Sequence, residues 1–201
     1  DGITFLRNLM RLRPMPVIMI STLTEAGADI TLEALNIGAF DFLPKPRANL
    51  GKGLLEYSDE IVQKIRAAAR ANVRQLERCS DQSRVPAARP ASRIVDYAPR
   101  PGALIAIGAS TGGTEAIKEV LMQLPANCPP VVITQHIPPL FSKSFALRMD
   151  TTCAMNVHEA SANQKLLPGN VYIAPGDLHL LLKRSNDGLV TLLSSSERVH
   201  H

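Results

Sequence analysis

The amino-acid sequence predicts an α/β fold built from two domains with parallel sheets. Short apolar runs alternate with amphipathic stretches, and strands that alternate with helices form parallel sheets. Residues 79–101 interrupt this alternation with four prolines and no sustained apolar period. The alternation then restarts, and a length of 201 residues suffices for two small domains. We therefore expect domains at 1–78 and 102–201, joined by a linker at 79–101.

The first domain is expected to contain three helices and two strands. Helices are predicted near 3–12, 28–37 and 59–77, and strands near 16–21 and 40–43. Ser58 can cap the last helix, because a serine hydroxyl accepts a hydrogen bond from a free N–H of the first turn. The buried stripe of that helix is expected to hold Ile61, Ile65, Ala69, Val73 and Leu76.

The second domain is expected to continue the same pattern and to end in a hairpin. Helices are predicted at 113–123 and 139–149. The predicted strands lie at 103–108, 130–135, 155–158, 171–174, 178–184 and 188–194. The residues from Ser185 to Gly188 carry the turn chemistry of a hairpin between the last two strands.

The composition argues against a membrane-spanning or secreted protein. No apolar run approaches the roughly 20 residues that cross a bilayer, and the first residues do not have the pattern of a signal peptide. Cys79, Cys128 and Cys153 are far apart and odd in number, which fits reduced thiols in the cytoplasm. The chain begins without methionine inside an amphipathic pattern, so we expect the start of a domain to precede residue 1.

The positive charge of the chain is local. The net charge is +4, yet residues 64–100 alone hold nine Lys or Arg against three acids. This excess belongs to one helix and the linker, and no groove-fitting motif accompanies it. We therefore expect a solvated surface and no nucleic-acid partner.

A glycine-rich segment at Gly108–Gly113 follows a predicted buried strand and opens a predicted helix. Free backbone N–H groups at such a helix end can hold an anion. A phosphate-binding loop would need a lysine that is absent, and a dinucleotide site would need an acid where Gln135 and His136 stand. The form Gly-x-Ser-x-Gly instead fits a nucleophile, Ser110, on a strand-to-helix turn.

His136 favours the nucleophile interpretation. It ends the strand after the Ser110 helix, and a right-handed βαβ unit brings the carboxyl ends of both strands to one sheet edge. If the strands are neighbours, about 4.8 Å apart, serine and imidazole come within hydrogen-bonding reach. The alternative is that Ser110 caps a helix and His136 is a polar strand end, since short Gly/Ser patterns often match by chance.

These segments resemble a known family. LIAIGASTGGTEAI, VVITQHIPPLFSKSFALRMD and LLPGNVYIAPGDLHLLL are similar to the catalytic domain of the chemotaxis response-regulator protein-glutamate methylesterases. DGITFLRNLM, VIMISTLT and GAFDFLPKP resemble the later half of a receiver domain. The resemblance implies a partial flavodoxin-like receiver domain followed by a Rossmann-like esterase domain.

The resemblance implies that Ser110 is the nucleophile, His136 its general base, and the backbone near Thr111 an oxyanion site. The substrates would be methyl-esterified glutamates of chemoreceptors, and also receptor glutamines. Catalysis would need no cofactor or metal, and the third triad member would be an aspartate beyond residue 201.

A rival interpretation is a receiver-linked, non-catalytic anion-binding module. A DNA-binding output domain, suggested only by the basic linker, is a weaker one.

The receiver resemblance implies control by phosphorylation from the chemotaxis histidine kinase. Lys45 matches the lysine that pairs with the phosphoryl group. Ser21, or else Thr22, matches the hydroxyl residue that moves toward that group. Phe42 matches the aromatic residue that changes its rotamer. The acceptor aspartate and the ligands of Mg²⁺ would precede residue 1. The unphosphorylated receiver would obstruct the esterase through the face formed by 28–37, 40–43 and the helix starting at Asp59.

Overall fold

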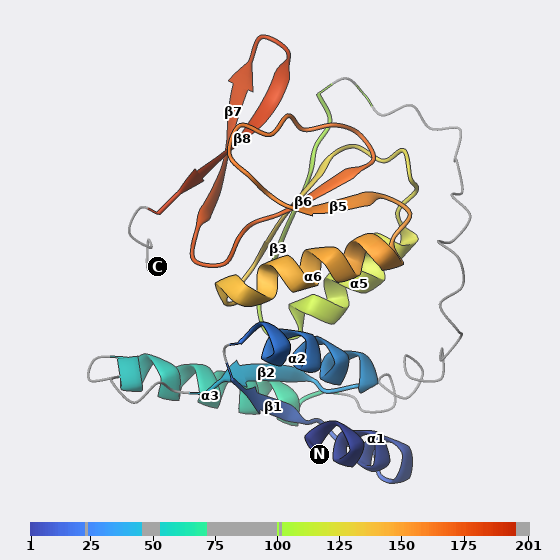
Figure 1. The fold of residues 1–201 in the computed structure, drawn as a ribbon, viewed down its shortest axis with the longest axis vertical. Helices are drawn as coiled ribbons and strands as arrows, with labels where there is room; N and C mark the ends of the chain where they lie inside the picture. Colours follow the sequence, from blue (N-terminus) through green and yellow to red (C-terminus); the bar gives the residue numbers. More distant parts are fainter. Residues whose placement is uncertain (23, 46–52, 72–99, 101, 196–201) are drawn as a thin grey trace. The chain divides into compact units, whose positions relative to one another are not determined.

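The computed structural model describes residues 1–22, 24–45, 53–71, 100 and 102–195 (Figure 1). Contacts within the chain divide it into two compact units, Asp1–Val85 and Pro86–His201. The linker expected at 79–101 lies outside the described residues apart from Arg100.

The described residues of the first unit form a parallel pair of strands and three helices. Its elements are α1 (Gly2–Leu12), β1 (Ile18–Ser21), α2 (Glu25–Ile37), β2 (Asp41–Pro44) and α3 (Gly53–Ala69). The β1–β2 register pairs Ile18 with Asp41 and Ser21 with Pro44. Asp1 caps α1 by accepting a hydrogen bond from Thr4 N at 2.8 Å. The strand and helix order of an α/β unit is therefore present, as expected.

Helix α3 corrects two expectations. It begins at Gly53, so Ser58 lies inside the helix and is not its N-cap. Ile65 is 53% exposed, whereas Lys64 and Ala68 are buried. Lys64 turns inward because its ammonium donates to the Phe42 carbonyl at 2.8 Å and lies 3.3 Å from Asp41 Oδ1.

Within the part of the second unit that the structure describes, there are two helices and six strands. Its elements are β3 (Ile105–Ala109), α5 (Gly113–Gln123), β4 (Val131–Gln135), α6 (Pro139–Thr152), β5 (Asn156–Glu159), β6 (Asn170–Ile173), β7 (His179–Ser185) and β8 (Gly188–Ser194). The first four strands form a parallel sheet in the order β3-β4-β6-β5, and β7 and β8 form the expected antiparallel hairpin. Every predicted element of this unit is confirmed within three residues at each end.

The central strands β4 and β6 are buried on both faces. Val131, Ile133, Val171 and Ile173 have no exposed surface, and alternation places them on one face of the sheet. Helices α5 and α6 lie side by side on one face of this sheet (Figure 1). On the other face, Val132 and Tyr172 pack in a cluster that includes leucines of the β7–β8 hairpin. Two covered faces explain why these strands are continuous apolar runs.

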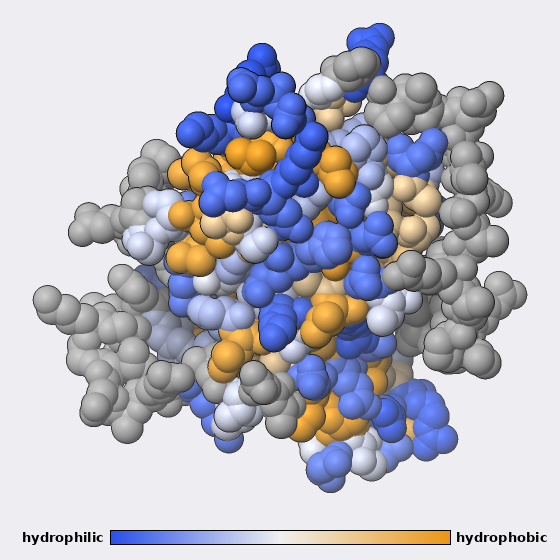
Figure 2. Space-filling model, turned by 45° about the horizontal axis from the view of Figure 1, so that its top comes forward, coloured by the Kyte–Doolittle hydropathy of each residue, from blue (hydrophilic) through white to orange (hydrophobic). Residues whose placement is uncertain are grey.

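The surface mixes polar and apolar groups. Figure 2 shows hydrophobic residues in separate patches between hydrophilic ones. Large exposed hydrophobic side chains occur on both units, for example Phe5 at 66% and Leu147 at 61% exposure. Among the helices of the described residues, none combines the length and apolar character needed to cross a bilayer.

Tyr172→Phe should destabilise the second unit by about 1–3 kcal/mol, the cost of leaving buried polar groups unpaired. The Tyr172 hydroxyl donates to the Lys165 carbonyl at 2.9 Å and accepts from Leu167 N at 3.0 Å. Hydrogen exchange of the β4 and β6 amides, followed by NMR, measures the unfolding free energy of this unit separately from the first. Unchanged exchange would contradict the importance of these two bonds.

Cys128 and Cys153 should resist alkylation by iodoacetamide at pH 8 in the folded protein. Burial, reinforced by Asp150, raises the pKa of Cys153 to about 11, and burial also raises the pKa of Cys128. Because the thiolate is the reactive form, about one thousandth of Cys153 is reactive at that pH. Peptide mass spectrometry should find both thiols modified only after addition of urea, and modification within minutes without urea would contradict this.

Candidate active site

Ser110 lies in the turn between β3 and α5. The turn is closed by a hydrogen bond from Gly113 N to the Ser110 carbonyl at 2.8 Å, and Gly112 has a φ of 70°, which favours glycine. Gly113 is required for a different reason: a Cβ there would collide with Gln135 Oε1 and lie 2.7 Å from Ala109 Cβ. The Ser110 side chain is exposed, as a nucleophile on such a turn must be.

His136 follows β4 at the same edge of the sheet. The parallel register pairs Ala109 with Gln135 as the last residues of β3 and β4. His136 N then donates to the Ala109 carbonyl at 3.2 Å, which extends the pairing by one residue. Ser110 and His136 are therefore the first residues beyond the paired ends of two neighbouring strands, as the sequence predicted. No hydrogen bond joins the Ser110 hydroxyl to the His136 ring among those of the described residues.

Gln135 ties these two segments together. Its side-chain Nε2 donates to the Ser110 carbonyl at 2.8 Å, and the His136 carbonyl lies 3.4 Å away. Two carbonyl acceptors on the same nitrogen fix the orientation of the amide. The Oε1 atom of Gln135 is buried and has no hydrogen-bond partner.

Thr111 lies one residue before the N-cap of α5. That N-cap is Gly112, and α5 begins at Gly113. The backbone N–H groups of a helix's first turn have no partner within the helix and form its positive end. Thr111 therefore lies at the positive end of α5, beside Ser110.

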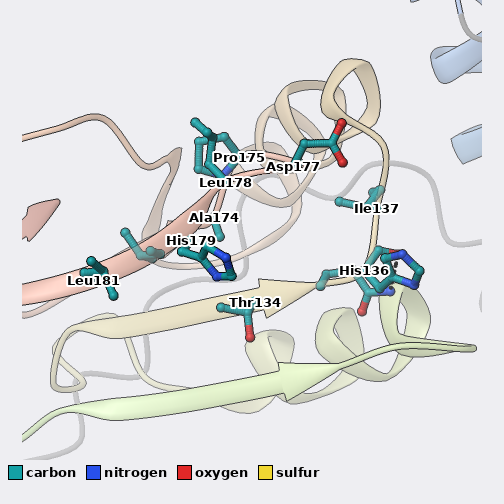
Figure 3. Close-up of a pocket in the computed structure, with 12 residues that line it drawn as sticks. Thr134, His136, Ile137, Ala174, Pro175, Asp177, Leu178, His179 and Leu181 are labelled. Atoms are coloured by element: carbon teal, nitrogen blue, oxygen red, sulfur yellow. Dashed lines mark hydrogen bonds between the residues drawn. The ribbon is translucent and has the colours of Figure 1, made fainter. Parts of the chain in front are cut away.

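A pocket of about 610 Å³ opens next to His136 (Figure 3). It is lined by the end of β4, by residues 174–178 (the Gly176 loop) and by the start of β7. His136 and Ile137 form one side, and Asp177 and Leu178 line it from the Gly176 loop. Ser110 is not among the lining residues, so the pocket lies beside the serine turn on the histidine side.

The Gly176 loop is fastened to the segment that follows His136. Gly176 N donates to Ser142 Oγ at 3.0 Å, and that hydroxyl lies 2.6 Å from Glu159 Oε1. A Cβ on Gly176 would lie 2.6 Å from both the Ile137 carbonyl oxygen and the Pro138 carbonyl carbon. A glycine is therefore needed for the two backbones to touch.

His158 and His179 are the other histidines of the described residues. His158 Nε2 lies 3.2 Å from Asn170 Oδ1 between β5 and β6, while His179 lines the same pocket as His136. Within the described ranges, no three His, Cys, Asp or Glu side chains are grouped so that they could hold a metal ion.

Ser21 and Lys45 meet at the carboxyl ends of β1 and β2, whereas Phe42 is the second residue of β2 and pairs with Met19 of β1. Lys45 N donates to the Ser21 carbonyl at 2.7 Å, and Ser21 Oγ donates to the Gly27 carbonyl at 3.3 Å. Phe42 is buried at 4% exposure, and the Lys64 ammonium lies 5.4 Å from its ring centroid. The Lys45 side chain is exposed.

Sequence reasoning missed four residues around Ser110 and His136: Gln135, Ser142, Glu159 and Gly176. Their contacts join segments that are 17 to 34 residues apart. No local pattern indicates such pairs. The one available signal was the abrupt change from apolar to polar at the strand end Thr134–His136.

Residues 105–201 match the family model of the CheB methylesterases. The protein-glutamate methylesterase/protein-glutamine glutaminase 1 of Dechloromonas aromatica is 49% identical over this whole chain, which covers 57% of that protein. The protein-glutamate methylesterase/protein-glutamine glutaminase 2 of Saccharophagus degradans is 50% identical over the whole chain, which covers 57% of that protein. The chain thus spans little more than half the length of these curated relatives.

Among solved structures, the CheB methylesterase catalytic domain of Thermotoga maritima is 43% identical. The match covers 49% of this chain and 52% of that chain, with a TM-score of 0.47. Residues 105–201 are therefore the part of the chain that matches the CheB methylesterase family, and the chain is 49–50% identical over its length to protein-glutamate methylesterases/protein-glutamine glutaminases.

Proposed function

We propose that this chain forms part of a phosphorylation-regulated protein-glutamate methylesterase. Its substrates are methyl-esterified glutamates of chemoreceptors, and it also deamidates receptor glutamines. The observation that carries the proposal is the β3–β4 register, which makes Ser110 and His136 the first residues after two paired strand ends. The names of the relatives support the same reaction.

The reaction begins at the Ser110 hydroxyl. His136 takes its proton as the Ser110 oxygen attacks the ester carbonyl, and a tetrahedral intermediate forms. The intermediate collapses, the bond to the methoxy oxygen breaks, and methanol leaves with the proton from His136. Water then attacks the acyl-enzyme with His136 again as base, which releases the glutamate and restores Ser110. With a glutamine substrate, ammonia leaves in place of methanol.

Negative charge on the intermediate needs nearby donors. Thr111 supplies a backbone N–H group at the positive end of α5. Such donors are already oriented before the reaction, so they cost no reorganisation as the charge develops. Thr111 is therefore assigned to the oxyanion site.

The resemblance places the third triad member in a glycine-rich segment that this sequence does not contain. Asp177 is the carboxylate of the pocket wall, yet it has a φ of 62° within a Pro-Gly-Asp turn. Aspartate tolerates that conformation, which is ordinary turn chemistry. Asp177 is therefore assigned to the turn and not to the triad.

The alternative is an anion-binding module without catalysis. The same N–H groups at the start of α5 favour it, since a helix N-terminus attracts anions. The alternative gives no role to the exposed His136 at the neighbouring strand end. Covalent labelling of Ser110 by a serine-directed reagent such as a fluorophosphonate distinguishes the two, because an anion site requires no activated hydroxyl.

For the first unit we propose a regulatory receiver function in the cytoplasm, with the chemotaxis histidine kinase as phosphodonor. Lys45 pairs with the phosphoryl group as a charge-assisted contact, Ser21 moves toward it, and Phe42 changes its packing. The hydrogen bond that joins Lys45 to Ser21 at the carboxyl ends of β1 and β2 supports the proposal, and Phe42 lies within β2. Receiver phosphorylation uses Mg²⁺, whose acidic ligands the resemblance places before residue 1.

Ser110→Ala and His136→Ala, made in the protein that carries this chain, should each lower the rate of methanol release from methylated receptors by about 10⁴- to 10⁶-fold. Removal of one member of a catalytic triad has effects of this size. Ser185→Ala is a matched control, because Ser185 is exposed at the end of β7. Activity retained by either site variant, with unchanged circular dichroism, would contradict the assignment.

Lys45→Ala should weaken activation of the esterase by a small phosphodonor such as acetyl phosphate, without changing the activity measured in its absence. The lysine is needed only when the phosphoryl group is present, since it then supplies the opposing charge. The ratio of the two methanol-release rates measures the effect, in a protein that carries the acceptor aspartate. An unchanged ratio would refute the role of Lys45, and Lys183→Ala on β7 is the control.

A further inference from the structure

We propose that Ser142 and Glu159 are positioning residues of the catalytic site. Together they fasten the Gly176 loop to the segment that carries His136, and so fix the imidazole relative to Ser110. The inference rests on the proposed function. Neither residue touches the reacting atoms; both act through backbone.

The Ser142 hydroxyl is the centre of this arrangement. Ser142 lies in the first turn of α6 and is fully buried. Its oxygen accepts from Gly176 N at 3.0 Å, while two acceptors compete for its single proton: Glu159 Oε1 at 2.6 Å and the Pro139 carbonyl at 2.8 Å. A serine in a helix usually bonds back to a carbonyl of the preceding turn.

Glu159 changes that preference. A hydrogen bond to a carboxylate is stronger than one to a neutral carbonyl, so Glu159 holds the proton of Ser142 away from Pro139. The lone pairs of the hydroxyl then face the Gly176 N–H. Glu159 itself is held at the end of β5, where it pairs with Ile173 of β6. The sheet edge therefore sets the orientation of the hydroxyl.

The connection from His136 to Pro139 transmits this constraint. Two consecutive prolines restrict its backbone angles and those of the residue before them. One end is held by the His136 N–H bond to Ala109 at 3.2 Å. The other end packs so closely against Gly176 that a Cβ on residue 176 would collide with it. Because this connection is stiff, its residues move together. Release of the Gly176 loop from Ser142 therefore displaces the connection and, with it, His136.

The test compares Ser142→Ala and Glu159→Ala with Glu159→Gln. Both alanine variants should lower kcat for methanol release by about 10- to 100-fold with little change in KM, because a small misplacement of a catalytic group is this costly. Glu159→Gln keeps an oxygen that accepts from Ser142 and should recover most of kcat. The controls are Ser144→Ala on the same helix and Glu119→Ala on α5, where Glu119 is exposed.

The NMR signals of the His136 imidazole give a second readout that does not need activity. Both alanine variants should shift them, and the two controls should not. If kcat and the His136 signals match the wild type while only the unfolding temperature falls, Ser142 and Glu159 are merely structural and the proposal is overturned. Glu159→Ala keeps the test decisive if Ser142→Ala does not fold, since Glu159 is only half-buried.

A parallel Ser110→Ala variant separates this inference from the proposed function. Methanol release that survives Ser110→Ala refutes the proposed function, and the His136 signals still decide whether Ser142 and Glu159 position the imidazole. Loss of methanol release in Ser110→Ala, with wild-type kcat and His136 signals in the Ser142 and Glu159 variants, refutes the positioning role alone.

Discussion

The backbone hydrogen bond from His136 to Ala109 continues the parallel pairing of β3 with β4 beyond their last paired residues. A one-residue slip of this register would move Ser110 away from His136 and turn the alternating side chains of β4 to the wrong face. The register is protected because Val131 and Ile133 are buried on one face and Val132 on the other. The position of the candidate site therefore depends on the packing of a strand that carries no catalytic group.

Burial on both faces also explains where polar groups occur. Polar side chains cluster at the carboxyl ends of the strands, where the sheet stops and backbone groups need partners. Gln135, Ser142 and Glu159 each satisfy such a group or orient another side chain that does. The same edge therefore holds both the groups assigned to chemistry and the groups that hold them in place.

Local patterns predicted most of the second unit, because its central strands β4 and β6 are apolar runs and its helices have clear boundaries. The Ser110 turn and His136 were also predictable, since βαβ chirality links strand ends that are far apart in sequence. The buried face of helix α3 was not predictable in this way. The apolar pattern predicts that Lys64 faces solvent, whereas its contacts with Asp41 and the Phe42 carbonyl turn it inward. Ser142 and Glu159 were missed because their contact depends on the packing of α6 against β5, which periodicity does not reveal.

The order of these segments along the chain has a consequence during synthesis on the ribosome. His136 and Ser110 are both made before Gly176, which follows 40 residues after His136. At about 5–20 residues per second, that interval lasts about 2–8 s. During it the nascent chain holds serine and histidine on strands that can already pair, while Gly176, whose N–H donates to the Ser142 hydroxyl, has not been translated. We expect the geometry of the site to be completed only when β6 and the loop after it join the sheet. A pause in translation within this interval therefore lengthens the time during which the site is incomplete.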